Sequence, residues 1–369
     1  MRIGIDAREL CGHATGVGRY LGGLLRQWAQ DERARRHEFV LYAHEPLGLE
    51  LDGRRFATRV VAGSCGVWWE QVDLPRVIAG DHLDVFFAPA YTAPLRLTAP
   101  LVVAIHDLSF FAHPEWFPVG EGVRRRWLTR RAATLARAVV TISEFSRREI
   151  VERLGVREPR VHLIPPGVTP PTTGRAPEAG EQRLLFVGSI FQRRHVPDLI
   201  RAFAPVARAH PDASLELVGD NRSCPREDVP ALIAAEGLRA RAHWHAFVSD
   251  DELGGMYARA RAFAFLSEYE GLGLTPLEAL AAGVPPVLAD TPVARESCGD
   301  AAIYVGVGDV AGATRALAAV LYDDATRARL MAAAPAVLSR YSWPRAARET
   351  LQVIEQATEG PAEPTRDAR

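Results

Sequence analysis

Two glutamates, Glu270 and Glu278, lie eight residues apart around a glycine turn that contains Gly271 and Gly273. The turn follows the apolar segment 262–266, which predicts a buried strand. A glycine loop that leads from a strand into a helix N-terminus presents free N–H groups and the positive end of the helix dipole, and therefore predicts an anion site. Carboxylates beside a phosphate would repel it. We therefore expect the two glutamates to accept hydrogen bonds from sugar hydroxyls.

The helix after this turn has recognisable start and stop signals. Thr275 is the expected N-cap, Pro276 the first helical residue, and Gly283 the residue that ends the helix. Thr275 and Glu278 also have the spacing of a capping box, in which the glutamate would only satisfy backbone donors. Capping and ligand binding therefore remain alternative roles for Glu278.

A second candidate site lies after the apolar run 184–187, where Gly188 ends a predicted strand and Arg193 and Arg194 follow before a helix. Guanidinium groups bind phosphate with two parallel hydrogen bonds, so this loop predicts a phosphate contact. An exposed basic turn is the alternative.

His106 and Asp107 come at the carboxyl end of the predicted strand 101–105. Open α/β sheets bind their ligands at this edge, although a His-Asp pair can also be purely structural. Near the N-terminus, Gly16 and Gly18 make a poor dinucleotide fingerprint, because they come about ten residues after the first strand and Leu21 replaces the third glycine. A Rossmann dehydrogenase is therefore disfavoured, and an ordinary loop is the alternative to a ligand loop.

Composition limits the possible functions. The chain has 369 residues, of which 48% are hydrophobic, and this length predicts two domains at roughly 100–200 residues each. The net charge of −1 argues against a general nucleic-acid-binding protein. All 44 basic residues are arginine, which excludes a catalytic or P-loop lysine.

The four cysteines are far apart in the sequence, at positions 11, 65, 224 and 298. This spacing predicts neither a zinc knuckle nor a disulfide framework, and it favours a reduced, cytoplasmic protein. No apolar run approaches the ~18 residues of a membrane span, and the N-terminus reads as a strand rather than a signal peptide.

Short β-branched runs alternate with amphipathic segments along the whole chain. The expected strands are 3–6, 38–42, 85–87, 101–105, 139–142, 184–187, 214–218, 243–245, 262–265 and 284–288. The expected helices are 17–29, 122–136, 144–154, 196–209 and 276–282. This alternation predicts an α/β fold of two doubly wound, Rossmann-like domains.

Residues 165–180 contain five prolines and three glycines, so they predict a break between the domains. We expect domains at 1–168 and 182–342, a hinge at 169–181 and a disordered tail at 359–369. Residues 1–168 carry 23 arginines against 19 acids, whereas residues 169–369 carry 21 against 26. The first half is therefore mildly basic and the second mildly acidic.

The segment EGLGLTPLEALAAGVPPV resembles the E-x7-E motif of family 4 retaining glycosyltransferases, which have two facing Rossmann domains in the GT-B architecture. Leu272 and Thr275 replace the family's usual phenylalanine and proline. The resemblance implies that Glu270 contacts the transferred sugar and that Glu278 contacts the ribose of a nucleotide-sugar donor. The loop amides would hold the diphosphate, and they come from the residues Gly273, Leu274 and Thr275.

Further segments resemble the same family. VGSIFQRRHVPDLIRAF matches a family stretch in which Arg193 grips the diphosphate and in which Arg194 stands in place of a lysine. His106 matches a histidine that hydrogen-bonds the transferred sugar. Gly16 and Gly18 match a flexible loop that faces the donor phosphates across the cleft.

HAFVSDDEL resembles the stretch whose backbone, at Phe247 and Val248, meets the nucleotide base. Residues 343–358 would form a helix that crosses back to the first domain. The resemblance covers nearly the whole chain, and closure about the hinge would exclude water.

The resemblance implies a retaining transfer of a hexosyl residue from a nucleotide-diphosphate sugar to a glycan or lipid-linked acceptor in surface polysaccharide synthesis. GDP-mannose is the first donor to test and UDP-hexoses are next. No cofactor, metal or nucleic-acid partner is expected. The alternatives are a nucleotide-sugar epimerase of the same architecture and a non-catalytic sugar-nucleotide-binding protein.

Residues 121–137 carry six arginines and one glutamate, with Trp127 among them. Such a helix fits an anionic membrane at the inner face of the plasma membrane, or it is a solvated face over a core-facing tryptophan. Trp68, Trp69 and Glu70 resemble a family loop on the acceptor side. On a strand the two tryptophans would point in opposite directions, so we expect one of them in the core.

Overall fold

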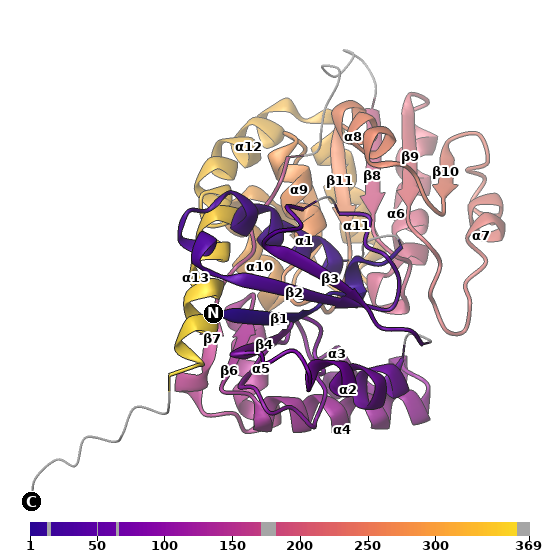
Figure 1. Cartoon of the computed structure of the whole chain (residues 1–369). Helices are drawn as coiled ribbons and strands as arrows, with labels where there is room; N and C mark the ends of the chain where they lie inside the picture. Colours follow the sequence, from indigo (N-terminus) through magenta and orange to yellow (C-terminus); the bar gives the residue numbers. More distant parts are fainter. Residues whose placement is uncertain (13–15, 50, 64–65, 171–181, 360–369) are drawn as a thin grey trace, which may run out of the picture. The chain divides into compact units, whose positions relative to one another are not determined.

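The computed structural model describes residues 1–12, 16–49, 51–63, 66–170 and 182–359. It divides the chain into two units (Figure 1). The first comprises Met1–Gly167 and the C-terminal helix α13 (Trp343–Gln356), and the second comprises Val168–Tyr341. Residues 171–181 of the predicted hinge and the predicted tail from 360 lie outside the described residues.

The first unit is built on a seven-stranded sheet whose paired strands all run parallel. Its strands are β1 (Arg2–Asp6), β2 (Glu38–Ala43), β3 (Phe56–Val60), β4 (Val85–Ala88), β5 (Leu101–Ala104), β6 (Ala138–Thr141) and β7 (Val161–Leu163). They lie in the order β3-β2-β1-β4-β5-β6-β7, which is the Rossmann order with one strand added. The central strands are buried on both faces because helices cover the sheet, as is usual for parallel sheets.

The helices of this unit are α1 (Gly16–Gln30), α2 (Leu74–Ile78), α3 (Ser109–Ala112), α4 (Val119–Leu135), α5 (Glu144–Leu154) and α13. Helix α13 packs against α1, and the indole Nε1–H of Trp28 donates to the carbonyl oxygen of Ala347 over 2.8 Å. A Cβ atom at Gly23 would lie 2.4 Å from the ring of Trp343, so this close packing requires glycine.

The second unit repeats the pattern with a six-stranded parallel sheet. Its strands are β8 (Gln182–Val187), β9 (Ala213–Val218), β10 (Ala242–His245), β11 (Ala262–Phe265), β12 (Pro286–Ala289) and β13 (Ile303–Val305). Their order is β10-β9-β8-β11-β12-β13, which is again the Rossmann order. The helices are α6 (Val196–Ala209), α7 (Val229–Ala235), α8 (Asp250–Arg259), α9 (Leu274–Ala281), α10 (Pro292–Cys298), α11 (Val310–Tyr322) and α12 (Asp324–Leu338).

All ten expected strands are present, with ends shifted by up to two residues, and α5 and α6 have the expected bounds. Three strands, β3, β7 and β13, were not expected. Each lies at an edge of its sheet, where solvent-facing positions dilute the apolar pattern.

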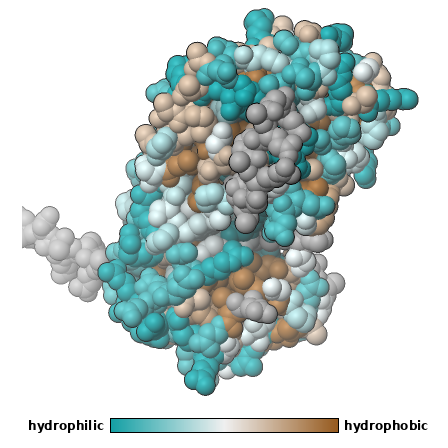
Figure 2. Space-filling view, turned by 90° about the horizontal axis from the view of Figure 1, so that it is seen from above, coloured by the Kyte–Doolittle hydropathy of each residue, from teal (hydrophilic) through white to brown (hydrophobic). Residues whose placement is uncertain are grey.

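Hydrophilic residues predominate on the face shown in Figure 2, with apolar residues in separate groups among them. No helix within the described residues is long and apolar enough to cross a membrane.

Candidate functional site

In the second unit the predicted catalytic loops lie at the point where the strand order reverses. Strands β8 and β11 are parallel neighbours, and the chain moves outward from them in opposite directions. Arg193 and Arg194 follow β8, and Glu270 follows β11. Crevices at such a switch point, beyond the carboxyl ends of the strands, are where open α/β sheets bind ligands. The topology therefore brings together residues that are 76 positions apart in the sequence.

Arg194 and Glu270 form an ion pair between these loops. The Nε–H of Arg194 donates to Oε1 of Glu270 over 2.9 Å, and the Oγ–H of Ser267 donates to the same oxygen over 2.9 Å. The Nη1 group of Arg194 donates to the carbonyl oxygen of Ser189 over 2.9 Å. Both charged side chains are mostly buried, so the pair is held in one geometry.

The carboxyl group of Glu270 is ionised at neutral pH. Burial alone would raise its pKa, but the positive charges of Arg194 and Arg193 and hydrogen bonds from Arg194 and Ser267 outweigh burial. The pKa of Glu270 therefore lies below its ordinary value, and Glu270 can accept hydrogen bonds from a ligand.

Gly188 makes room for Arg194. Its φ is +149°, and a Cβ atom there would lie 2.6 Å from Nη1 of Arg194. The guanidinium group thus packs against the Cα atom of Gly188, in the position from which its Nε–H donates to Glu270. A larger residue would displace it.

Arg193 occupies the same short helical turn. Its carbonyl oxygen accepts from the backbone N–H of Glu268 over 2.9 Å, which ties the β8 loop to the β11 loop. Its guanidinium carbon lies 4.4 Å from the ring centroid of Phe191. Among the described residues, the buried Nε–H of Arg193 has no hydrogen-bond acceptor.

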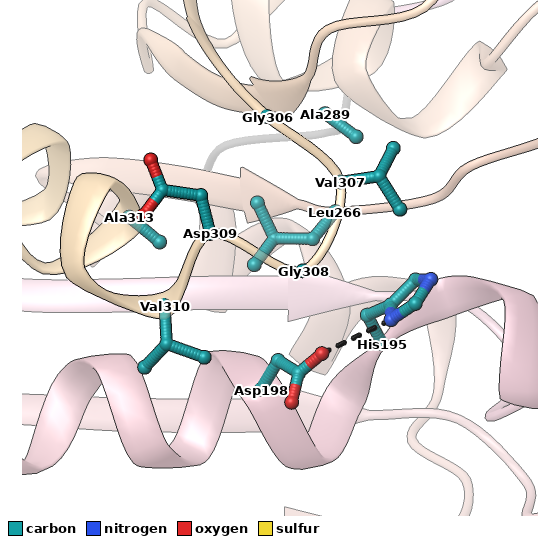
Figure 3. A pocket seen from close by; sticks show the side chains of 10 residues that line it. All are labelled: His195, Asp198, Leu266, Ala289, Gly306, Val307, Gly308, Asp309, Val310 and Ala313. Atoms are coloured by element: carbon teal, nitrogen blue, oxygen red, sulfur yellow. Dashed lines mark hydrogen bonds and ion pairs between the residues drawn. The ribbon is translucent and has the colours of Figure 1, made fainter.

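His195 follows the two arginines and was not singled out from the sequence. It adopts a left-handed conformation, with φ of +48°, at the start of α6. Its Nδ1 lies 3.1 Å from Asp198 Oδ2, and its Nε2 lies 3.5 Å from Glu268 Oε2. Figure 3 shows His195 and Asp198 at one side of a small hollow that faces the turn 306–310. The Asp198 contact therefore fixes His195 at the start of α6, and its Nε2 makes no hydrogen bond with Glu268.

The start of α9 differs from the expectation. The helix begins at Leu274 with Gly273 as its N-cap, and no side chain caps it. The prediction of Thr275 as N-cap and of Pro276 as first helical residue is wrong, because Gly273 adopts a positive φ of +88° and turns the chain two residues earlier. The first-turn N–H groups of Leu274 and Thr275 are the donors of this helix end.

Because Thr275 is not the N-cap of α9, Glu278 is not part of a capping box. Glu278 lies in the middle of α9 and is half-buried, and the hydroxyl of Tyr257 lies 3.5 Å from its Oε2. Gly271 is buried, but its φ is not positive, so of the two turn glycines only Gly273 has a conformation that favours glycine.

Phe247 and Val248 lie between β10 and α8, at the carboxyl edge of the same sheet. The side chain of Phe247 is 64% exposed, which is unusual for phenylalanine. Ser249 then caps α8 through a capping box with Glu252.

In the first unit, His106 lies just beyond the carboxyl end of β5. Its Nε2 lies 2.8 Å from the carbonyl oxygen of Pro89, and its ring packs edge-on against Tyr20 and Tyr91. Burial lowers the pKa of His106, so the ring is neutral at pH 7. Because a carbonyl oxygen can only accept, Nε2 carries the proton and Nδ1 is an acceptor.

Gly16 and Gly18 do not form the expected flexible loop. Both belong to the first turn of α1, and Gly18 is buried there. The same helix carries Tyr20 against the ring of His106, with ring centroids 4.7 Å apart. Helix propensity alone disfavours glycine, so packing of the amphipathic helix decides its start.

A buried charge cluster beyond β1 was also missed. Arg8 pairs with Asp6, 2.9 Å from its Oδ2, and with Glu70. Glu70 also accepts from Thr92 and from Gln71, which both belong to the first unit. Burial raises the pKa of Asp6 to about 6, even though Arg8 lowers it. The sequence feature that could have indicated this cluster is the Asp6-x-Arg8 spacing at the end of the first strand.

Glu70 lies in a π-helical turn, Trp69–Asp73, and not in the strand that was considered for the two tryptophans. Trp69 is fully buried and Trp68 is 69% exposed, so the expectation that one of them belongs to the core is confirmed. Turns of this type are frequent at functional sites.

Two family models match the chain. Residues 14–170 match the model described as Glycosyltransferase Family 4, and residues 175–337 match the model described as Glycosyl transferases group 1. The chain belongs to glycosyltransferase family 4. The resemblance drawn from the E-x7-E segment is thereby confirmed.

Two curated relatives of this glycosyltransferase are named as mannosyltransferases. It is 26% identical over 288 residues to the O-antigen chain mannosyltransferase B of Escherichia coli, covering 74% of this chain and 75% of that one. It is 30% identical over 254 residues to the phosphatidyl-myo-inositol mannosyltransferase of Mycobacterium leprae, covering 66% and 64%.

Solved structures confirm the fold of the glycosyltransferase. WaaG, a glycosyltransferase of lipopolysaccharide biosynthesis, matches with a TM-score of 0.76 at 15% identity over 96% of this chain and 99% of that one. Anabaena Alr3699/HepE in complex with UDP and glucose matches with a TM-score of 0.76 at 19% identity, over 96% and 100%. These likenesses establish the two-domain GT-B class.

Proposed function

We propose that this glycosyltransferase moves a hexosyl residue from a nucleotide-diphosphate sugar to a glycan or lipid-linked acceptor with retention of configuration. The observation that carries the proposal is the Arg194–Glu270 pair at the switch point of the second sheet, next to the uncapped N-terminus of α9. The positive groups that would bind a diphosphate therefore lie next to the carboxylate that would bind sugar hydroxyls.

The donor diphosphate would be held by Arg193, Arg194 and the amides at the start of α9. The unsatisfied Nε–H of Arg193 supports this role, because a buried donor without a partner costs about 1–3 kcal/mol and a nearby anion can offset that cost. These positive groups also stabilise the charge that develops as the diphosphate leaves. In this proposal they supply the charge that a metal ion would otherwise provide.

The sugar and nucleoside parts of the donor need the remaining groups. Glu270 would accept hydrogen bonds from hydroxyls of the transferred sugar, and Glu278 from the ribose. The exposed ring at Phe247, followed by Val248, offers a surface for the base. The first unit would contribute Nδ1 of His106, which would accept a hydrogen bond from a sugar hydroxyl.

Retention follows if the acceptor attacks from the face that the diphosphate leaves. The bond between the anomeric carbon and the phosphate oxygen breaks, and the acceptor oxygen bonds to the same carbon. The acceptor proton passes to the departing phosphate oxygen. Glu270 is committed to Arg194 and Ser267, which favours a positioning role for this carboxylate over attack on the sugar.

GDP-mannose is the first donor to test, because several similar curated proteins are named as mannosyltransferases. UDP-hexoses come next. Thermal unfolding with UDP, GDP, dTDP, ADP and NAD separates these choices, since a ligand at a hundredfold its Kd adds about 2.7 kcal/mol.

We expect one nucleoside diphosphate to raise the Tm and the matching sugar donor to give an α-linked product from an α-linked donor, as read by NMR coupling constants. An inverted product would disprove retention. A Tm shift with NAD alone, or conversion of the donor without any acceptor, would favour a dehydrogenase or an epimerase instead.

Gly188→Ala tests the Arg194 geometry. The added Cβ would displace the guanidinium group from Glu270, and we expect kcat/KM to fall on the order of 10²-fold, as for other small misplacements. Gly283→Ala is the matched control, because Gly283 has a positive φ of +81° but no atom within 4 Å of its added Cβ. An equal fall of kcat/KM in both variants would show that backbone strain, and not the displacement of Arg194, causes the loss of activity.

We also propose that the protein works at the inner face of the plasma membrane, through α4. Val119, Val123 and Trp127 repeat every fourth residue of this helix and are exposed, and Arg124 and Arg130 are exposed beside them. This pattern suits an anionic bilayer surface.

We expect the protein to sediment with phosphatidylglycerol vesicles and not with phosphatidylcholine vesicles, and we expect Trp127→Ser to weaken sedimentation. Equal sedimentation of wild type and variant would exclude α4 as the contact.

A further inference from the structure

Three side chains of types that bind transition metals come together in the first unit, outside the proposed donor site. They are Cys11, His44 and Glu45, and one ligand atom of each lies within 4.8 Å of the other two. We propose that these residues form a binding site for a zinc ion.

The sheet topology brings these residues together. Cys11 follows the short helical turn after β1, and His44 and Glu45 follow β2 directly. Strands β1 and β2 are parallel neighbours, with Asp6 opposite Tyr42, so their carboxyl ends meet at one edge of the sheet. The Sγ of Cys11 lies 3.8 Å from the backbone oxygen of Glu45. Because 32 residues separate Cys11 from His44 in the sequence, the spacing of the cysteines gives no indication of this site.

The ring of His44 is held in place with a nitrogen available. It packs edge-on against the buried ring of Trp69, with centroids 6.3 Å apart, and its side chain is 19% exposed. Its buried Nδ1 has no hydrogen-bond partner among the described residues. Its Nε2 lies 4.0 Å from Oε1 of Glu45, which is beyond hydrogen-bond distance. The ring of His44 can therefore offer a nitrogen to a metal ion.

The ligand set selects the metal. Thiolate, imidazole and carboxylate together suit zinc, whereas calcium and magnesium require six or more oxygen ligands. In tetrahedral zinc sites the bonds are about 2.0–2.3 Å long, so neighbouring ligand atoms lie roughly 3.5 Å apart. Small side-chain rotations would bring these atoms from within 4.8 Å to that spacing. On binding, the Cys11 thiol loses its proton to solvent and forms the zinc–sulfur bond, and water takes the fourth position.

The site is independent of the proposed transfer chemistry. None of its three residues belongs to the donor site or to the Asp6–Arg8–Glu70 cluster, although His44 shares Trp69 with that cluster through the cation–π contact of Arg8. Metal binding can therefore be measured whether or not the donor assignment is correct.

Cobalt titration of the metal-stripped full-length protein tests the proposal. A Co²⁺ ion bound to a thiolate gives a near-ultraviolet sulfur-to-metal charge-transfer band, and added Zn²⁺ displaces it. We expect one equivalent of Co²⁺ to give this band in wild type. Cys11→Ser should abolish the band, and His44→Ala and Glu45→Gln should each weaken binding at least roughly tenfold.

Cys224→Ser is the matched control, because Cys224 is an exposed cysteine in the second unit. It should leave the band unchanged, and circular dichroism of every variant should match wild type. Absence of a band in wild type, a band that survives Cys11→Ser, or a band lost in Cys224→Ser would each overturn the assignment.

Discussion

Replacing Glu270 by glutamine is expected to lower kcat for sugar transfer on the order of 10²–10³-fold, the usual cost of removing one precisely placed polar group from a reacting centre. The carboxylate accepts from both Arg194 and Ser267 through one oxygen. An amide keeps the shape but loses the charge, so Arg194 would no longer be held by an ion pair. Steady-state transfer with the donor identified by thermal shift measures the effect.

Glu268→Gln is the matched control for this variant. Glu268 lies in the same loop, but its carboxylate faces His195 at 3.5 Å and not Arg194. We expect its kcat to stay within about threefold of wild type. Glu268→Gln should keep the wild-type Tm. Glu270→Gln should lower the Tm, because it leaves the mostly buried guanidinium group of Arg194 without its ion-pair partner, so circular dichroism at the assay temperature should show that both variants are folded. A Glu270→Gln enzyme with unchanged kcat would remove Glu270 from the proposed mechanism.

Replacing Arg8 by alanine is expected to destabilise the first unit by about 3–5 kcal/mol, the cost of leaving buried charges without their partner. Asp6 and Glu70 are buried, and Arg8 is the cation that pairs with both. Truncation would also remove the contact of the guanidinium group with the ring of Trp69. Hydrogen exchange at the amides of β1 and β4 reports on this unit alone.

Arg295→Ala provides the comparison, because Arg295 pairs with Asp290 at the surface, where the two side chains are 58% and 42% exposed. An exposed pair contributes at most about 1 kcal/mol. If Arg8→Ala and Arg295→Ala lowered the free energy of unfolding by the same small amount, the buried cluster would contribute no more to stability than a surface ion pair.

Local patterns in the sequence are sufficient for the α/β class and for most elements. Apolar runs that are buried on both faces, such as β4 and β8, differ strongly in composition from the amphipathic helices between them. The same patterns place Glu270 and Arg193 in loops after strands, because glycine and polar residues follow the apolar runs. The E-x7-E segment identifies the family for the same local reason.

The start of α9 shows where local patterns fail. A threonine-proline pair is a common helix start, yet Gly273 makes the turn two residues earlier. The packing of the loop between β11 and the helix decides which of two acceptable caps is used. Gly16 and Gly18 likewise enter α1 because the helix packs along its apolar face, although glycine disfavours helix.

The partners of the charged side chains depend on strand order, which no local pattern contains. Arg194 meets Glu270 because β8 and β11 are neighbours, Arg8 meets Glu70 because a π-helical turn brings Glu70 to the end of β1, and Cys11 meets His44 because β1 and β2 are neighbours. Sequence patterns report the periodicity and the residue types of single segments. Contacts between segments follow from the lowest-energy packing of the whole sheet, so only the tertiary structure assigns them.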